Sequence, residues 1–246
     1  MKEFKGSTIL VTGSTKGIGN SIANLLADEG AKIIYNGRDP FDLNDNSDHL
    51  FFKGDLSQKS ECIRLNDFMN DHQVNLSGLV CNIGSGSSVA PGNESREEWG
   101  RVFDTNFFSC TGVIESLKDR IIENKTPIVI TSSICGLEIL GAPLTYSVAK
   151  SAVNMYTVGL AKAWGKYGVR INAVAPGNIL FNGSVWERKL AENKKAVEEM
   201  LSRDVALQRL GKPEEISEVV KFLLSSKSSF VTGSILVADG GQVRGV

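Results

Sequence analysis

Short runs of apolar and β-branched residues recur along the chain, and between them apolar residues return every three or four positions. Seven of these runs predict buried strands, at residues 8–11, 32–35, 50–52, 78–81, 128–131, 169–174 and 234–237. The helical spacing is clearest after the first strand and before the last, at Ile18, Ile22, Leu25 and Leu26 and at Ile216, Val219, Val220 and Leu223. Strands that alternate with helices predict a doubly wound, Rossmann-type α/β fold with a seven-stranded parallel sheet covered on both faces.

The length of the chain fits one such domain. Its 246 residues, of which 41% are hydrophobic, are enough to bury one sizeable core, and α/β folds of this size are commonly single domains. The sequence contains no internal repeat, low-complexity tract or linker. We therefore expect a single nucleotide-binding domain over residues 1–246.

Charge and cysteine usage narrow the class of partner. With 27 basic and 28 acidic residues the formal net charge is −1, which gives no general attraction to nucleic acid or to an anionic membrane. No apolar stretch is long enough to span a bilayer, and the first five residues lead directly into a strand pattern. The four cysteines show no C-x-x-C spacing and are expected to be buried thiols. These features predict a soluble, cytoplasmic protein.

The sequence has few histidines for metal binding or for Ser-His catalysis. The sequence has two histidines, His49 and His72, and neither stands beside another ligand at metal spacing. Zinc chemistry and Ser-His catalysis are therefore disfavoured, and no G-x-S-x-G occurs. We expect no metal site and assign both histidines as surface or internally satisfied residues.

A glycine-rich loop follows the first strand and opens the first helix. Glycine permits the turn and a close approach of backbone to phosphate, while the free N–H groups at a helix start favour an anion. The spacing is G-x-x-x-G-x-G, without the Gly-Lys-Ser/Thr ending of a nucleoside triphosphate loop. The strand-turn-helix context favours a dinucleotide pyrophosphate seat over a turn needed only for packing. Its residues are Gly13, Ser14, Thr15, Lys16, Gly17, Ile18 and Gly19.

The end of the second strand indicates which dinucleotide binds. An NAD enzyme would place a carboxylate there for the ribose hydroxyls, but the chain has Gly37 followed by Arg38. Lys16 can point toward the same place, which gives two cations for a 2′-phosphate. Exposed cations are usually only solvated, so neither residue decides alone. Together they favour NADP, bound as NADPH, over NADH.

The stretch TYSVAK at residues 145–150 places Lys150 four residues after Tyr146. On a helix such residues share a face about 5–6 Å apart. At an effective dielectric of about 20 the ammonium would attract a phenolate by about 3 kcal/mol, enough to lower the tyrosine pKa by roughly 2 units. A tyrosine tuned in this way exchanges a proton near neutral pH. The pair alone would favour an amphipathic surface helix in which the spacing is accidental.

Taken together, the motifs resemble those of the short-chain dehydrogenase/reductase family over nearly the whole chain. Each is weak alone, but their order is specific. They are the glycine-rich loop, Asp55 and Leu56 after the third strand, Asn82 and Gly84 after the fourth, Asn106, Ser133, Tyr146 with Lys150, Pro176 with Gly177, and Asp239-Gly240-Gly241.

The resemblance implies a role for each position. Tyr146 would protonate the substrate oxygen, Ser133 would hydrogen-bond that oxygen, Lys150 would bind the nicotinamide ribose and lower the phenol pKa, and Asn106 would connect Lys150 to a water relay. Beyond the glycine loop and Arg38, the implied cofactor-binding residues are Asp55, Leu56, Asn82, Gly84, Tyr146, Lys150, Pro176, Gly177 and Ile179. A purely turn-forming role competes for Asn82 and, less strongly, for Asp55.

Three departures from the family pattern bear on the substrate. The loop after the fourth strand, Ser85-Gly86-Ser87-Ser88, is small and is expected to be flexible. Phe181 stands where the family often has a threonine that binds the carboxamide. Asn124 and Tyr167 stand where acyl-carrier-protein reductases carry two docking arginines, which disfavours carrier-bound substrates.

The leading hypothesis is an NADP-dependent oxidoreductase that interconverts a carbonyl and a secondary alcohol on a small or medium substrate of sugar or 3-oxoacyl type. The alternative is a non-catalytic NADP-binding or scaffold protein of the same fold, and sugar-nucleotide epimerases also use Tyr-x-x-x-Lys. By resemblance we expect a homotetramer or homodimer.

The stretch after Pro176 and Gly177 predicts a substrate lid at residues 178–203. Residues 185–201 predict a helix with Trp186, Leu190, Val197 and Leu201 near one face. That face either docks permanently on the core or closes over the substrate. Gly177 and Gly183 flank the connection as possible hinges, which favours the lid.

Overall fold

Seven parallel strands form one sheet in the spatial order β3-β2-β1-β4-β5-β6-β7. The computed structural model describes residues 2–43 and 48–244. The strands are β1 (Thr8–Val11), β2 (Lys32–Gly37), β3 (Leu50–Lys53), β4 (Leu76–Cys81), β5 (Ile128–Thr131), β6 (Ile171–Pro176) and β7 (Ile235–Ala238). The predicted doubly wound fold is confirmed.

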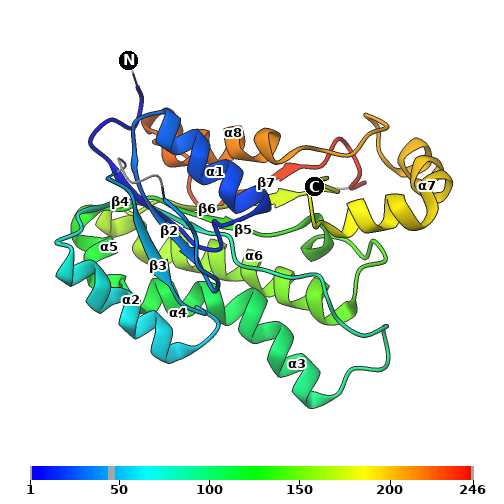
Figure 1. Cartoon of the computed structure of the whole chain (residues 1–246), viewed down its shortest axis with the longest axis horizontal. Coiled ribbons are helices and arrows are strands. Elements are labelled where there is room, and N and C mark those ends of the chain that lie inside the picture. The colour runs from blue at the N-terminus through cyan, green and yellow to red at the C-terminus, as the bar shows by residue number, and fades with distance from the viewer. Residues whose placement is uncertain (1, 44–47, 245–246) are drawn as a thin grey trace.

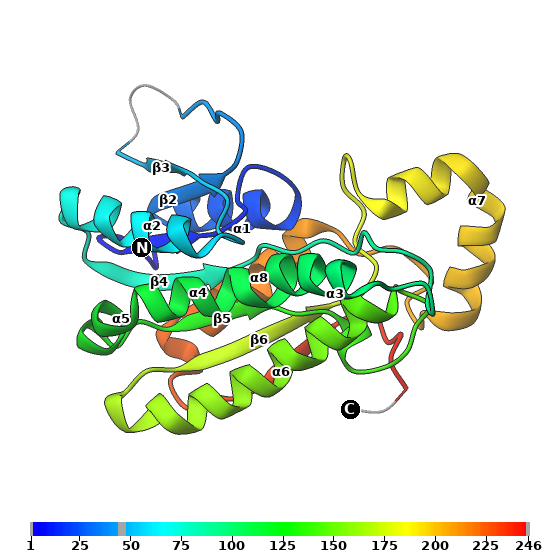
Figure 2. The same cartoon turned by 90° about the horizontal axis from the view of Figure 1, so that it is seen from below.

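Helices cover both faces of this sheet. Figure 1 shows α1 (Gly17–Asp28) and α8 (Pro213–Leu224) on one face, with α2 (Lys59–Asp71), α4 (Ser109–Ser116) and α6 (Leu144–Trp164) on the other. Figure 2, seen from below, has α4 and α6 in front of the sheet and α8 behind it. The shorter helices α3 (Arg96–Phe103) and α5 (Lys118–Asn124) lie on the α6 side. None of the helices in the described ranges is long and apolar enough to cross a membrane.

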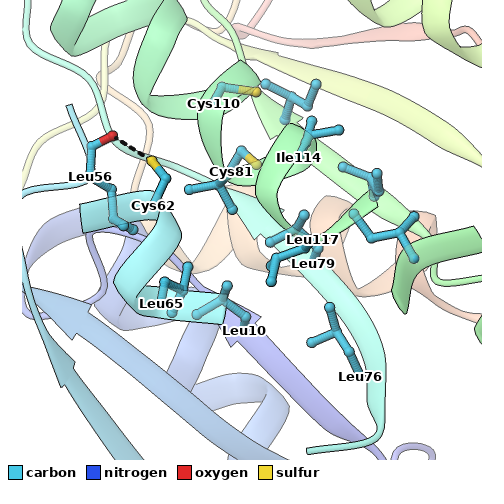
Figure 3. Packing of buried hydrophobic residues seen from close by; sticks show 14 of the residues in the cluster. Leu10, Leu56, Cys62, Leu65, Leu76, Leu79, Cys81, Cys110, Ile114 and Leu117 are labelled. Carbon is cyan, nitrogen blue, oxygen red and sulfur yellow. Dashed lines mark hydrogen bonds between the residues drawn. The ribbon is translucent and has the colours of Figure 1, made fainter. Parts of the chain in front are cut away.

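Two apolar layers explain why the strands are apolar along their whole length. The layer under α2, α4 and α6 includes Leu10, Leu79 and Ile130, and the layer under α1 and α8 includes Ile9 and Val80. Consecutive strand residues therefore enter opposite layers, as expected for a parallel sheet buried on both faces. Figure 3 shows three of the cysteines, Cys62, Cys81 and Cys110, as buried members of the first layer.

The order of the strands fixes where a ligand can bind. The chain runs outward from β1 to β2 and β3, then returns to place β4 on the other side of β1. The connections after β1 and β4 therefore leave the sheet in opposite directions, and ligands of open α/β sheets bind at the carboxyl ends of the strands beside such a reversal. The glycine loop, Asn82, Ser133 and Pro176 all lie at this edge.

Helix α7 (Val185–Asp204) stands apart from both layers at the same edge of the sheet (Figures 1 and 2). Its buried residues Val197 and Leu201 form a small cluster of their own with Val205, against which Trp186 and Leu190 pack. The helix is interrupted at Asn193, whose φ of −156° is not helical and whose Oδ1 accepts a hydrogen bond from the N–H of Ala196 at 3.0 Å. The predicted helix is thus two capped segments joined at a kink.

Candidate active site

The glycine-rich loop is shaped to bring backbone close to an anion. Gly17 has a φ of +58°, which favours glycine, and a Cβ at residue 19 would overlap the carbonyl oxygen of Gly13. Within the described part of the chain no side chain caps the start of α1, so its first N–H groups point outward unsatisfied. This cradle fits the pyrophosphate of a dinucleotide.

Asn36, which sequence reasoning missed, anchors the loop. Its Oδ1 accepts a hydrogen bond from the N–H of Gly13 at 3.1 Å, and its Nδ2 donates to the carbonyls of Phe52 and Gly54, both at 3.1 Å. Its own N–H donates to Ser14 Oγ at 2.9 Å. Asn36 is buried, so these bonds tie β1, β2 and β3 together at the edge where a cofactor would bind. The available signal was a polar residue inside the apolar run of β2.

Asn82 has a similar fastening role. Its Nδ2 donates to the carbonyl of Gly13 at 3.2 Å, and its Oδ1 accepts from Thr131 Oγ1 at 3.2 Å. The side chain therefore joins the ends of β1, β4 and β5. These are bonds between strands rather than within a turn, and the cofactor role of Asn82 stays a prediction.

Two of the expected cofactor residues bury their side chains in the core. Leu56 belongs to the layer under α2, and Ile179 belongs to the layer under α1 and α8, where its backbone pairs with Gly211. Their main chains remain at the edge of the sheet. Asp55 accepts hydrogen bonds at Oδ1 from the N–H of Ser57 at 3.1 Å and from its hydroxyl at 2.7 Å, which leaves Oδ2 for another donor.

The cations expected to meet a 2′-phosphate are accessible. Lys16 and Arg38 are exposed, and neither side chain has a hydrogen-bond or ion-pair partner within residues 2–43 and 48–244. Gly37 between them in the fold is buried, and a Cβ there would lie 2.5 Å from Thr15 Cγ2. A carboxylate side chain at residue 37 would therefore have to displace Thr15.

Ser133 and Tyr146 meet at the carboxyl end of β5. Ser133 follows the strand and caps the short helix η2 (Ile134–Gly136) by accepting from the N–H of Cys135 at 3.2 Å. Tyr146 lies in the first turn of α6, near enough to Ser133 for this side chain to influence its phenol. Burial raises the pKa of the Tyr146 phenol to about 12, and the neighbouring Ser133 side chain opposes this only in part.

Lys150 lies one turn further along α6 and is almost completely buried. It is 3% exposed, and its Nζ is 5.9 Å from the centroid of the Tyr146 ring and donates to the carbonyl of Thr131 at 2.8 Å. Burial lowers the pKa of Lys150 to about 8. The expected lowering of the tyrosine pKa is therefore wrong for this structure, because burial penalises the charged form of both groups.

Asn106 lies in a π-helical turn, η1 (Asp104–Phe108), between α3 and α4. Its Oδ1 accepts from the N–H of Ser85 at 2.9 Å, and its Nδ2 donates to the carbonyls of Ser85 and Val102, both at 3.0 Å. A Cβ at Gly84 would lie 3.1 Å from both Asn106 Oδ1 and Lys150 Nζ. Asn106 thus holds the loop after β4 against Lys150.

That loop is fastened by hydrogen bonds that its small residues did not predict. Besides the bonds to Asn106, the N–H of Ser87 donates to Ser85 Oγ at 3.2 Å, and Arg101 Nη2 donates to the carbonyl of Ser87 at 2.9 Å. The sequence could not reveal this because Asn106 and Arg101 lie on elements that follow the loop.

Of the two glycines expected to act as hinges in the segment after β6, only one is free to move. A Cβ at Gly177 would lie 2.7 Å from Asp239 Cα, and its N–H donates to the carbonyl of Ala238 at 3.0 Å, so this glycine is locked against β7. Gly183, with a φ of +80° and open space around it, remains as a hinge. Phe181 covers the glycine loop, with its ring 2.6 Å from the place of a Cβ on Gly17.

Comparisons with known proteins agree with this architecture over nearly the whole chain. A family model described as Enoyl-(Acyl carrier protein) reductase matches residues 13–242. A tropinone reductase homologue of Arabidopsis thaliana is 32% identical over 246 residues, which cover 96% of this chain and 92% of that protein. Glucose 1-dehydrogenase of Gluconobacter oxydans is 32% identical over 254 residues, which cover 97% of this chain and 92% of that protein.

A solved structure gives the same result in three dimensions. The ligand-free aldohexose dehydrogenase of Thermoplasma acidophilum superposes with a TM-score of 0.86 at 28% identity, covering 98% of this chain and 95% of that one. The names of all three proteins are those of dehydrogenases or reductases.

Proposed function

Because the chain belongs to the short-chain dehydrogenase/reductase family, we propose that it interconverts a carbonyl and a secondary alcohol on a small or medium substrate with NADP as cofactor. Family membership makes the chain an oxidoreductase; the cofactor, the bond and the substrate class are the proposal. The observation that carries it is the grouping of Ser133, Tyr146 and Lys150 near the carboxyl ends of the strands, where Ser133 and Lys150 are buried and Tyr146 is half-buried.

Each of these side chains has a task in carbonyl reduction. When bound, a reduced nicotinamide supplies a hydride to the carbonyl carbon. The O–H bond of Tyr146 breaks as its proton passes to the carbonyl oxygen, while the hydroxyl of Ser133 donates a hydrogen bond to the same oxygen. With a pKa of about 12 the phenol stays protonated at neutral pH, as a proton donor requires.

Lys150 stabilises the charge that Tyr146 acquires. An ammonium this near the Tyr146 ring favours a phenolate over its neutral form electrostatically, although burial outweighs this effect in the resting protein. The bond from Lys150 Nζ to the carbonyl of Thr131 fixes the position of the ammonium.

The residues of the glycine loop would hold the cofactor pyrophosphate, and Arg38 with Lys16 would hold a 2′-phosphate. The support for NADP over NAD is the pair of exposed, unpartnered cations in the described structure together with the lack of a carboxylate at Gly37.

For the substrate, the relatives support a sugar-type or other small ketone or alcohol, since they include a glucose 1-dehydrogenase, an aldohexose dehydrogenase and a tropinone reductase homologue. The matching family model is named for acyl-carrier-protein substrates, so a 3-oxoacyl compound stays within the proposal. Asn124 and Tyr167 at the docking positions weigh against the carrier-bound form.

We also propose a homotetramer or homodimer in the cytoplasm. Phe108 on η1 and Met155 on α6 expose 49% and 73% of their surface on one side of the molecule, where a second copy could cover them. The four cysteines are free thiols, which suits a reducing compartment.

The proposal includes a lid formed by residues 178–203. Its support is that the apolar face of α7 packs on Val205 and Leu210 rather than on either layer of the main core. Gly183 supplies the hinge, and Phe181 in the same segment would have to leave Gly17 when a pyrophosphate arrives.

The experiment is a panel of sugars, small ketones and 3-oxoacyl thioesters assayed with NADPH and with NADH, reading consumption of the reduced nicotinamide. Turnover of at least one carbonyl with a higher kcat/KM for NADPH supports the proposal. Absence of turnover across the panel, with NADPH bound, contradicts it.

A further inference from the structure

The loop between β4 and α3 touches the catalytic helix on both sides of Tyr146. At one end Gly84 lies against Lys150, four residues after the tyrosine. At the other end Ser88 Oγ lies 2.7 Å from Thr145 Oγ1, immediately before it. The loop therefore spans the turn of α6 that carries the reactive phenol.

The contact at Ser88 is part of a directed chain of hydrogen bonds. Ser88 Oγ also lies 2.7 Å from Glu98 Oε1 in α3. Arg101 first and Ser88 second lower the pKa of Glu98 to about 2, so this carboxylate is ionised and only accepts. The single proton of Ser88 must point to Glu98, and Thr145 must then donate to Ser88.

Arg101 holds the Glu98 carboxylate in place. Its Nε donates to Glu98 Oε2 and its Nη2 donates to Glu98 Oε1, both at 2.7 Å, and Nη2 also reaches the carbonyl of Ser87. The same carboxylate is thus fixed by a two-pronged ion pair while it receives the hydroxyl of Ser88. Planar pairs of this kind hold their geometry better than single contacts between flexible side chains.

Local stabilisation of α3 does not account for this chain of bonds. An ion pair between Glu98 and Arg101 alone would serve a helix, since the two residues are three apart. Thr145, however, is 57 positions away from Ser88, is completely buried and adjoins Tyr146. Ser88 connects the Glu98–Arg101 ion pair of α3 to α6, the helix that carries Tyr146.

We propose that Ser88, Glu98 and Arg101 are positioning residues which, through Thr145, hold the 84–94 loop as a fixed wall beside Tyr146 and thereby set the KM for the carbonyl substrate. The inference rests on the proposed function, because it assumes that the substrate oxygen lies at Tyr146. It adds a specificity role to residues outside the Ser133-Tyr146-Lys150 group.

The test compares Ser88→Ala with Ser87→Ala. The neighbouring serine lies in the same loop, but of the contacts in the described structure only its backbone groups take part. Thr145→Val removes the hydroxyl with little change of shape, and Thr145→Ser restores it. For each variant we would measure KM and kcat, the Kd of NADPH, and hydrogen exchange of amides 85–94.

We expect Ser88→Ala and Thr145→Val to raise the KM of the carbonyl substrate roughly 10-fold, while kcat changes by less than about 3-fold, because each variant loses a hydrogen bond between the loop and α6. Loop amides should exchange faster in both variants. The Kd of NADPH should stay within about 2-fold, and Ser87→Ala and Thr145→Ser should resemble the unaltered protein.

Two outcomes would overturn the inference. Unchanged exchange of amides 85–94 in Ser88→Ala would mean that the bonds do not hold the loop, and faster exchange with an unchanged KM would mean that the loop does not serve the substrate. If no carbonyl is turned over by the unaltered protein, the proposed function fails by itself, and the exchange comparison still decides whether the bonds hold the loop.

Discussion

The ammonium of Lys150 lies 5.9 Å from the centroid of the Tyr146 ring, yet its hydrogen bond goes to the carbonyl oxygen of Thr131. The two side chains are thus neighbours, Lys150 buried and Tyr146 half-buried, although the described structure has no hydrogen bond between them. Burial lowers the pKa of Lys150 to about 8 and raises the pKa of Tyr146 to about 12. Shifted pKa values of this kind are common at catalytic sites. The burial that shifts the pKa of Lys150 also lowers the free energy of unfolding.

The cost to stability is measurable as a pH dependence. The unfolded chain, with an ordinary lysine pKa of 10.5, binds a proton that folded Lys150 has released above pH 8. The free energy of unfolding of the free enzyme should therefore rise with pH between about 8 and 10.5, and Lys150 should contribute about 2 kcal/mol of that rise between pH 7.5 and 9.5.

Urea unfolding of the unaltered protein, of Lys150→Met and of Lys162→Met at these two pH values tests this. Lys162 is an exposed lysine on the same helix. The rise should shrink in Lys150→Met and persist in Lys162→Met. An identical pH dependence in all three proteins would show that Lys150 titrates normally.

Cofactor preference should depend on Arg38. Arg38→Ala is expected to weaken NADPH about 10- to 100-fold, the effect of losing a charge-assisted bond to phosphate, and to leave NADH nearly unchanged. Calorimetric titration of both cofactors measures this. Lys32→Ala, at the opposite end of β2, is the control and should alter neither. Equal losses for both cofactors would contradict a 2′-phosphate site. Gly37→Asp is a poorer test because its Cβ meets Thr15.

The glycine loop should tolerate no side chain at Gly19. Gly19→Ala places a Cβ against the carbonyl of Gly13 and the amide of Asn82, so we expect a loss of about 1–3 kcal/mol in the free energy of unfolding and a weaker affinity for NADPH. Gly159→Ala is the matched control, since a Cβ there meets nothing within 4 Å. In α6 that change should stabilise by about 0.5–1 kcal/mol. Equal effects of the two substitutions would refute the close approach.

If residues 178–203 form a lid, cofactor binding should slow their amide hydrogen exchange, and a change in the lid should alter the reaction of the substrate. Amides 180–201 should exchange quickly in the free enzyme and slowly with NADPH bound, and Trp186→Ala should change KM or kcat more than the Kd of NADPH, because Trp186 packs on the small cluster of α7. Trp164→Ala, at the far end of α6, should leave KM unchanged. Strong protection of amides 180–201 with and without cofactor would mean that α7 is a fixed part of the fold.

The sequence predicted the sheet well because its strands are buried on both faces, where runs such as residues 8–11 and 128–131 read as continuous apolar segments. The four residues expected to be catalytic lie near one another at one edge because a motif spacing on α6 and strand ends on a parallel sheet fix their places. Local pattern and topology were sufficient for both results.

Three features depended on contacts between distant segments and could not be predicted. Asn36 looked like an isolated polar residue, yet it joins three strands. The serine-rich loop looked flexible, yet Asn106 and Arg101 fasten it. The sequence predicted a lowered pKa for Tyr146, but burial raises it. Helix spacing reveals the neighbouring charge of Lys150 and does not reveal how deeply the phenol is buried.

The central claim is that Tyr146 donates the proton to the substrate oxygen. Tyr146→Phe keeps the ring and removes the donor, and Tyr156→Phe, two turns or more along the same helix, serves as the control. Turnover of the best substrate and the Kd of NADPH should be measured for both variants. The account predicts that kcat falls about 100-fold or more in Tyr146→Phe alone, with the Kd of NADPH within about 2-fold of the unaltered protein. Near-normal turnover in Tyr146→Phe would contradict it.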